Sequence, residues 1–410
     1  MLMKDPKFKN MFRYNEMTDR IEVQNAWWRR CTVNISDSDL NNIRFYLESE
    51  YCLSSEKNIP RGIDIIAHEN SYHPVREKLE SLTWDKVPRI SRLLTKYLGC
   101  DETEYTAAAI RIFMLAAISR VFEPGKKFDT MICLVEDKQG GGKSTICRFL
   151  AMKDEWFCDD VKNLDDENVY RKLQGHWICE FSEMLAASNT KTVEAIKAFL
   201  SRQKDVYKVP YERYPHDFPR QNVFIGTTNN LDFLPNDKTG NRRFIPIKCH
   251  SDRAEVHPMA DEKETRGFIL QCWAEAMEVF KTGDFSLTFP DHLQAELQET
   301  RNDFTPEDPK VGVIQEWLDN CSCDAVCTLM IYRECLGNEY GTPQRWELLE
   351  IANILTKEID DWEKYPTSDS KKRFPKYGKQ RAWTRKTTQK GRQGGFIPIE
   401  EGAPDAFGVF

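Results

Sequence analysis

A glycine-rich run near the middle of the chain holds the residues best suited to chemistry: Gln139, Gly140, Gly141, Gly142, Lys143, Ser144 and Thr145. Successive glycines let the backbone curve closely enough for its N–H groups to hold phosphate oxygens, and a helix that begins directly afterwards adds a favourable dipole. In such loops the lysine reaches the β- and γ-phosphates, and the serine hydroxyl binds Mg²⁺. The run therefore predicts a binding loop for ATP and Mg²⁺.

One position departs from the strict phosphate-loop pattern GxxxxGK[ST]. The pattern has a glycine where this chain has Asp137, whose carboxylate is expected at the entrance of the loop, where it bears on nucleotide affinity. The alternative interpretation is a glycine-rich turn with a chance Lys-Ser pair.

Hydrolysis also needs a carboxylate that holds the metal or polarises water at the end of a neighbouring strand. Glu180 ends the apolar run 177–179 and is the first candidate, with Glu183 as the second. Asn229 ends a further apolar run and is suited to orienting the attacking water. The alternatives are a solvated acidic turn at 180–183 and an ordinary Asn-Asn turn at 229–230.

Two adjacent arginines, Arg242 and Arg243, follow a flexible turn and precede an apolar run. A guanidinium is always ionised and suits the charge of a phosphoryl-transfer transition state. We expect one of the pair to act as an arginine finger across a subunit boundary. The alternative is a surface pair in a loop.

Strands and helices alternate around these residues. Short apolar runs predict strands at 131–135, 176–179, 222–227 and 244–248, and helical patterns cover 105–122, 146–152, 191–201 and 267–280. A strand, a glycine-rich loop and a helix in that order open an α/β nucleotide-binding core. We therefore expect an α/β P-loop NTPase core at 105–285, a helical N-terminal region at 1–104 and a C-terminal domain at 286–410.

Two segments have the composition of a nucleic-acid contact. Between the second and third strands, residues 197–220 combine cations with tyrosines, which suits a hairpin that grips single-stranded DNA; a solvated hairpin packed by its tyrosines is the alternative. The candidate DNA contacts in this segment are Arg202, Lys204, Lys208 and Arg213.

The second segment, residues 371–392, has ten cations and no acid, with a turn expected at Tyr377-Gly378. Together with the helices expected before it, at about 325–336 and 346–361, it predicts a winged-helix-like domain whose basic wing meets phosphates. A disordered basic tail, which would also bind polyanions, is the alternative. The candidate DNA contacts here are Lys371, Lys372, Arg373, Lys376, Lys379, Arg381, Arg385 and Lys386.

The overall composition fits a globular protein of two or three domains. The chain has 410 residues, 40% of them hydrophobic, and a formal net charge of −7. A negative net charge alone would argue against nucleic-acid binding. The value is an average, however, because the basic segment 371–392 is counted together with an acidic remainder of the chain. Thirteen cysteines in mostly apolar contexts indicate reduced thiols, and the N-terminus lacks the apolar segment of a signal peptide. We expect a cytosolic protein.

The order of these motifs resembles the virulence-associated protein E (VapE/VirE) family of phage and mobile-element proteins, relatives of superfamily-3 helicases among the AAA+ ATPases. The resemblance implies Walker A at Lys143 and Ser144, Walker B at Glu180, sensor 1 at Asn229, and the finger at Arg242 or Arg243. It covers about residues 10–285 and rests on the following segments: 73–75, 84–89, 124–129, 139–145, 177–180, 227–229 and 240–244.

The function that this resemblance implies is an ATP-dependent DNA translocase or helicase in replication initiation, in the cytosol of a bacterium or of a phage-infected host. It also implies single- or double-stranded DNA as a partner, a homo-oligomer such as a hexameric ring, and a separate primase. One alternative is an ATP-switched DNA-binding regulator or anti-phage protein without unwinding activity. Another is a GTPase or small-molecule kinase, although residues 229–232 lack the lysine of a guanine-reading motif.

Overall fold

A computed structural model of the chain describes residues 2–159, 161, 164, 169–182, 190–207, 216–235, 241–306 and 308–386. Three of the predicted site residues, Glu183, Lys208 and Arg213, lie outside these ranges, as does the basic segment beyond residue 386. The chain divides into two compact units, Met1–Pro306 and Glu307–Phe410.

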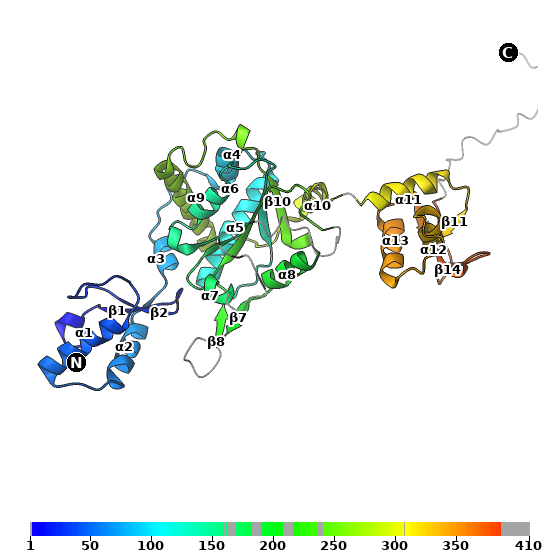
Figure 1. The fold of residues 1–410 in the computed structure, drawn as a ribbon. Coiled ribbons are helices and arrows are strands. Elements are labelled where there is room, and N and C mark those ends of the chain that lie inside the picture. The colour runs from blue at the N-terminus through cyan, green and yellow to red at the C-terminus, as the bar shows by residue number, and fades with distance from the viewer. Residues whose placement is uncertain are drawn as a thin grey trace, which may run out of the picture. The chain divides into compact units, whose positions relative to one another are not determined.

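A five-stranded parallel sheet lies at the centre of the first unit, and all four predicted strands belong to it (Figure 1). The α/β class is thereby confirmed. Strand β9 lies between β4 and β6, so the chain segment that follows β9 is placed between the segments that follow the other two strands. In spatial order the strands are β10 (Phe244–Lys248), β4 (Met131–Val135), β9 (Val223–Thr228), β6 (Ile178–Ser182) and β5 (Phe157–Cys158).

Helices cover both faces of this sheet, because successive side chains of a strand point to opposite faces. Ile132 and Leu134 of β4 pack on one face against α5 (Glu104–Phe122), α6 (Lys143–Leu150) and α9 (Glu262–Thr282). The residues between them, such as Cys133, pack on the other face against α8 (Thr190–Leu200) and α7 (Val169–Leu173). The near-continuous apolar runs of the strands are those of a sheet buried on both sides.

Helix α5 is the one helix of the described residues long and apolar enough to cross a membrane. Of its apolar window, 78% is buried inside the protein, so the helix is a core element of the first unit. Its side chains are apolar all round because they meet the sheet on one side and α9 on another.

The N-terminal region is not purely helical, which corrects the prediction for residues 1–104. Strands β1 (Phe12–Asn15), β2 (Arg20–Val23) and β3 (Ser71–Tyr72) form a small sheet that packs with α1 (Asp37–Tyr51) and α2 (Asn58–Glu69). The two strands of the hairpin β1–β2 are only four residues long, too short for a clear alternation in the sequence. Helices α3 (Pro74–Glu80) and α4 (Leu93–Leu98) belong instead to the core around the central sheet.

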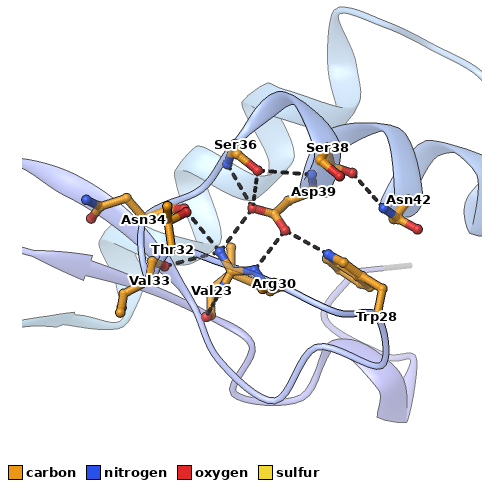
Figure 2. Close-up of polar contacts among 10 residues, drawn as sticks. All are labelled: Val23, Trp28, Arg30, Thr32, Val33, Asn34, Ser36, Ser38, Asp39 and Asn42. Atoms are coloured by element: carbon orange, nitrogen blue, oxygen red, sulfur yellow. Dashed lines mark hydrogen bonds and ion pairs between the residues drawn. The ribbon is translucent and has the colours of Figure 1, made fainter.

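A buried ion pair closes the loop between β2 and α1 (Figure 2). Arg30 Nε lies 2.7 Å from Asp39 Oδ1, and the indole N–H of Trp28 donates to the same oxygen. Ser36 caps α1 by accepting from the Asp39 N–H, and the Asp39 carboxylate accepts from the Ser36 N–H in return. Burial favours the neutral carboxyl, but these donors outweigh it and hold the pKa of Asp39 well below its ordinary value.

The second unit begins later than the boundary predicted at residue 286. Helix α10 (Gln294–Asp303) belongs to the first unit, because Arg301 Nε donates to the Phe244 carbonyl at 2.9 Å and Phe304 packs on the core of the sheet. The division at 306–307 therefore follows the side chains that anchor α10, which no composition change in the sequence marks.

The second unit is a small α/β domain with its own core, around Leu318, Val326, Leu355 and Trp383. Residues 325–327 form a strand, where the sequence suggested a helix, because they pair with the long strand β14. The predicted turn at 377–378 does join two strands, β13 and β14. In chain order the elements are α11 (Pro309–Asn320), β11 (Ala325–Cys327), α12 (Thr328–Met330), a π-helical turn (Ile331–Cys335), α13 (Arg345–Lys357), β12 (Trp362–Lys364), β13 (Lys371–Phe374) and β14 (Gly378–Arg385).

Candidate nucleotide-binding site

The glycine-rich run forms a tight loop between the carboxyl end of β4 and the start of α6. Gly140 and Gly142 have φ angles of +80° and +86°, a conformation that favours glycine. A Cβ at Gly142 would also lie 2.8 Å from the Pro258 ring. The strand, loop and helix therefore follow one another as predicted from the sequence, and α6 begins directly after Gly142.

Lys143 lies at the centre of the loop with its ammonium group surrounded by oxygens. Its Nζ is 2.9 Å from Asn229 Oδ1, 3.2 Å from the Lys138 carbonyl and 3.4 Å from Glu136 Oε2. Asn229 reaches this point because β9 is the neighbour of β4 in the sheet. The structure thus brings together the lysine expected to bind phosphate and the asparagine expected to orient the attacking water, which are 86 positions apart in the chain.

Ser144 and Glu180 also meet at this edge of the sheet. The Ser144 hydroxyl donates to Glu180 Oε1 at 2.6 Å, and Thr227 donates to the same oxygen. Glu180 is only 1% exposed, and burial raises the pKa of its carboxyl, although the two hydroxyl donors partly oppose that rise. A cation beside this carboxylate would favour its ionised form.

The residues at this edge fit a magnesium nucleotide. A carboxylate and a hydroxyl are oxygen donors of the kind that Mg²⁺ prefers, and Glu180 and Ser144 already lie within hydrogen-bond distance of each other. The backbone at Gly140 and Gly142 has the conformation of a loop that turns its N–H groups toward an anion. Gln139 and Ser144 are exposed and Thr145 is half-buried, so the loop is open to a ligand from solvent.

Two acidic residues at this edge were not predicted from the sequence. Glu136, the residue after β4, is buried beneath the loop, and Asp159, the residue after β5, lies close enough to raise the pKa of Glu180. Their position directly after strands is the signal that would have found them, because the carboxyl ends of parallel strands meet at one edge of the sheet.

Arg242 and Arg243 lie at the opposite edge of the sheet. They precede β10, and the first residue of β10 is paired with the first residue of β4, whereas the phosphate loop follows the last. A five-residue strand separates the two edges by roughly 16 Å. Arg243 is held by Asp129 at 3.6 Å and by Ser201, while the Arg242 side chain is exposed. Neither arginine reaches the phosphate loop of its own chain.

The predicted DNA hairpin is present as β7 (Lys204–Tyr207) and β8 (His216–Pro219). Its described cations have partners: Lys204 pairs with Asp217, and Arg220 forms a buried pair with Asp205. Arg202 contacts the Tyr170 hydroxyl. The described part of the hairpin is therefore close to neutral, which the count of cations alone did not indicate.

In the second unit the predicted cations lie on the hairpin β13–β14 and differ in their surroundings. Lys376 pairs with Glu334 and Lys379 with Asp369, while Arg385 donates to the Leu318 carbonyl. Among these predicted cations, the exposed ones for which the structure shows no acidic partner in the described residues are Lys371, Arg373, Arg381, Arg385 and Lys386. Lys372 is half-buried over the Tyr365 ring.

Comparisons with known proteins identify one family for this chain. The sequence profile described as the virulence-associated protein E-like domain matches residues 79–306, more than half of the chain. A comparison with curated proteins gives no match. Two solved structures of the NrS-1 C-terminal region align with 84% of the chain and 83% or 82% of their own length, at 14% and 15% identity and TM-scores of 0.41 and 0.43. A likeness at that level supports no statement about fold or activity.

Proposed function

Because the chain belongs to the virulence-associated protein E-like family, we propose that it is an ATP-hydrolysing, DNA-translocating protein of phage or mobile-element replication, working in the bacterial cytosol. The observation that carries the proposal is the meeting of Lys143, Ser144, Glu180 and Asn229 at one edge of the central sheet. These four groups supply a phosphate ligand, two metal ligands and a polar amide, which together are what ATP hydrolysis requires.

Each side chain has a distinct part in the proposed reaction. Lys143 binds the β- and γ-phosphates. Ser144 and Glu180 would hold Mg²⁺, and the ion would neutralise negative charge on the phosphates. Asn229 follows β9, which lies between β4 and β6 in the sheet, and orients the attacking water. Glu180 accepts hydrogen bonds from Ser144 and Thr227, which fix its position before a nucleotide binds.

An arginine finger would have to come from a second copy of the chain. Arg242 is the better candidate of the two, because it is exposed while Arg243 is tied to Asp129 and Ser201. Its position at the far edge of the sheet suits action on the nucleotide of a neighbouring subunit, which supports an oligomer such as a ring. A separate primase would then supply primers.

The second unit supplies the proposed DNA contact. Its helices α11, α12 and α13, with strand β11 after the first of them and the hairpin β13–β14 at the end, resemble the order of a winged helix, which supports β13–β14 as the wing. Helix α13 has a nearly neutral exposed face that includes Trp346 and Leu349, whereas Lys371, Arg373 and Arg381 lie on the wing. We therefore assign the phosphate contacts to the wing.

One observation favours the alternative of ATP-switched DNA binding without unwinding. Acidic residues neutralise Lys204 and Arg220 in the described part of the hairpin that a translocase would use to grip the strand. A strand-displacement assay separates the two functions, because only a translocase with a working grip unwinds a duplex while it hydrolyses ATP.

ATP turnover measured with and without single-stranded DNA tests the proposal. Lys143→Ala should reduce turnover at least about 100-fold, because an ammonium group that bonds the transferred phosphate is lost. Lys138→Ala is the matched control, since this neighbouring lysine is exposed and offers Lys143 only its backbone carbonyl. Equal turnover in the Lys143 variant and the control would refute the site.

A further inference from the structure

Glu136 is a buried carboxylate in the floor of the phosphate loop that the proposed reaction does not use. It is 2% exposed, and its Oε2 lies 3.4 Å from Lys143 Nζ. Its Oε1 accepts a hydrogen bond of 2.7 Å from the Ser251 N–H. A Cβ added to Gly141 would lie 2.1 Å from Oε2, so the loop passes directly over the carboxylate.

The charge of this carboxylate is retained in the folded protein. Burial alone would raise the pKa of Glu136, but the hydrogen bond from Ser251 and the nearby ammonium of Lys143 outweigh that effect and lower it. The loop that would bind the phosphates of a nucleotide therefore lies directly over the negatively charged carboxylate of Glu136. Since the surroundings exclude water, that charge is poorly screened.

From this geometry we propose that Glu136 is a positioning residue that holds the Lys143 ammonium in the loop and weakens the binding of polyphosphate. The inference rests on the proposed ATP site and concerns how tightly that site holds its ligand. The Lys143 ammonium then interacts with both the Glu136 carboxylate and the phosphates of the nucleotide. The carboxylate also repels each additional phosphate group. The protein therefore releases nucleotide more readily than it would if Glu136 carried no charge.

A purely structural role for Glu136 predicts a different result. In that case the carboxylate only fastens the loop to the segment after β10, through Ser251, and its charge is unimportant. Glu136→Gln separates the two roles, because glutamine has nearly the same shape and its amide oxygen still accepts from the Ser251 N–H. Lys143 retains its bonds to Asn229 and to the Lys138 carbonyl in this variant.

The test is titration calorimetry of the full chain with MgATP, MgADP and AMP. We expect Glu136→Gln to bind MgATP about tenfold more tightly than the wild type, MgADP with a smaller gain, and AMP nearly unchanged. Asp252→Asn is the matched control, since it removes the same charge from an exposed position next to Ser251 and should change each affinity less than about twofold. If Glu136→Gln does not fold, as judged by circular dichroism, Glu136→Met removes the same charge with a similar side-chain length.

The outcomes distinguish this inference from the proposed function. Unchanged or weaker MgATP binding in a folded neutral variant would overturn the role of Glu136 and leave the ATP site standing. An equal gain for AMP would also overturn it, because the repulsion must grow with the number of phosphates. Absence of MgATP binding by the wild-type chain would overturn both the ATP site and the inference.

Discussion

Replacing Asp205 by asparagine tests how the hairpin β7–β8 is anchored to the sheet domain. The Arg220 guanidinium binds Asp205 through two bonds of 2.8 Å, and its third nitrogen donates to the Phe199 carbonyl. The Arg220 side chain is 1% exposed and that of Asp205 8%. Asparagine keeps the shape of the acid but leaves the buried guanidinium without its counter-charge.

The expected loss follows from this burial. Removing one partner of a buried ion pair leaves the other charge uncompensated, which costs about 3 kcal/mol, or a factor of about 150 in the equilibrium for opening the hairpin. Lys204 and Asp217 form an ion pair on the same hairpin with side chains 58% and 54% exposed. Asp217→Asn is therefore a matched control that should cost less than about 1 kcal/mol.

Hydrogen exchange of the backbone amides in residues 204–207 and 216–218 measures the opening of the hairpin directly. Asp205→Asn should lower protection there by about two orders of magnitude, while Asp217→Asn should lower it less than about fivefold. Equal protection in the two variants would refute the argument, because it would mean that burial of the pair does not determine its strength.

Two further predictions concern the ends of the chain. Asp39→Asn should lower the free energy of unfolding of the N-terminal region by about 2 kcal/mol at pH 7, because the Arg30 pair is lost. Since the pKa of Asp39 is lower in the folded than in the unfolded state, its stabilisation is present above about pH 4 and declines as the pH falls. In urea titrations, the difference in the free energy of unfolding between wild type and variant should therefore be smaller at pH 3 than at pH 7. In the second unit, replacing Lys371 and Arg373 by glutamine should weaken DNA binding in a fluorescence anisotropy titration and reduce the slope of log K against log salt by about two. Trp346→Ala on helix α13 should leave both unchanged, and an equal loss in the two variants would contradict the assignment of phosphate contacts to the wing.

Much of the sheet domain was predictable from the sequence. Its strands are short apolar runs, and the loop between the first strand and its helix has the glycines that φ angles near +80° require. Glu180 and Asn229 were predicted because each follows an apolar run; in the structure Glu180 lies within β6, and Asn229 directly follows β9. Glu136 directly follows β4 but was not predicted, because only the fold shows that its carboxylate lies 3.4 Å from the Lys143 ammonium.

The ion pairs were not predictable from counts of charge. Lys204 was a predicted DNA contact and Arg220 lies in the same cationic segment. Their acidic partners lie 13 and 15 positions away and meet them only because β7 and β8 pair in one particular register. The same holds at the wing, where Glu334 reaches Lys376 from 42 positions away.

The glycine-rich loop could be predicted from the sequence, because the glycines, the lysine and the helix that follows are neighbours in the chain and act through local backbone geometry. Which residues complete the candidate site depends on the tertiary structure. Ser251 reaches Glu136 from 115 positions away, and Asn229 reaches Lys143 from 86. It also placed Arg242 at the far edge of the sheet. Contacts of that kind depend on the order of the strands, which is set by the packing of the whole core and not by any short segment.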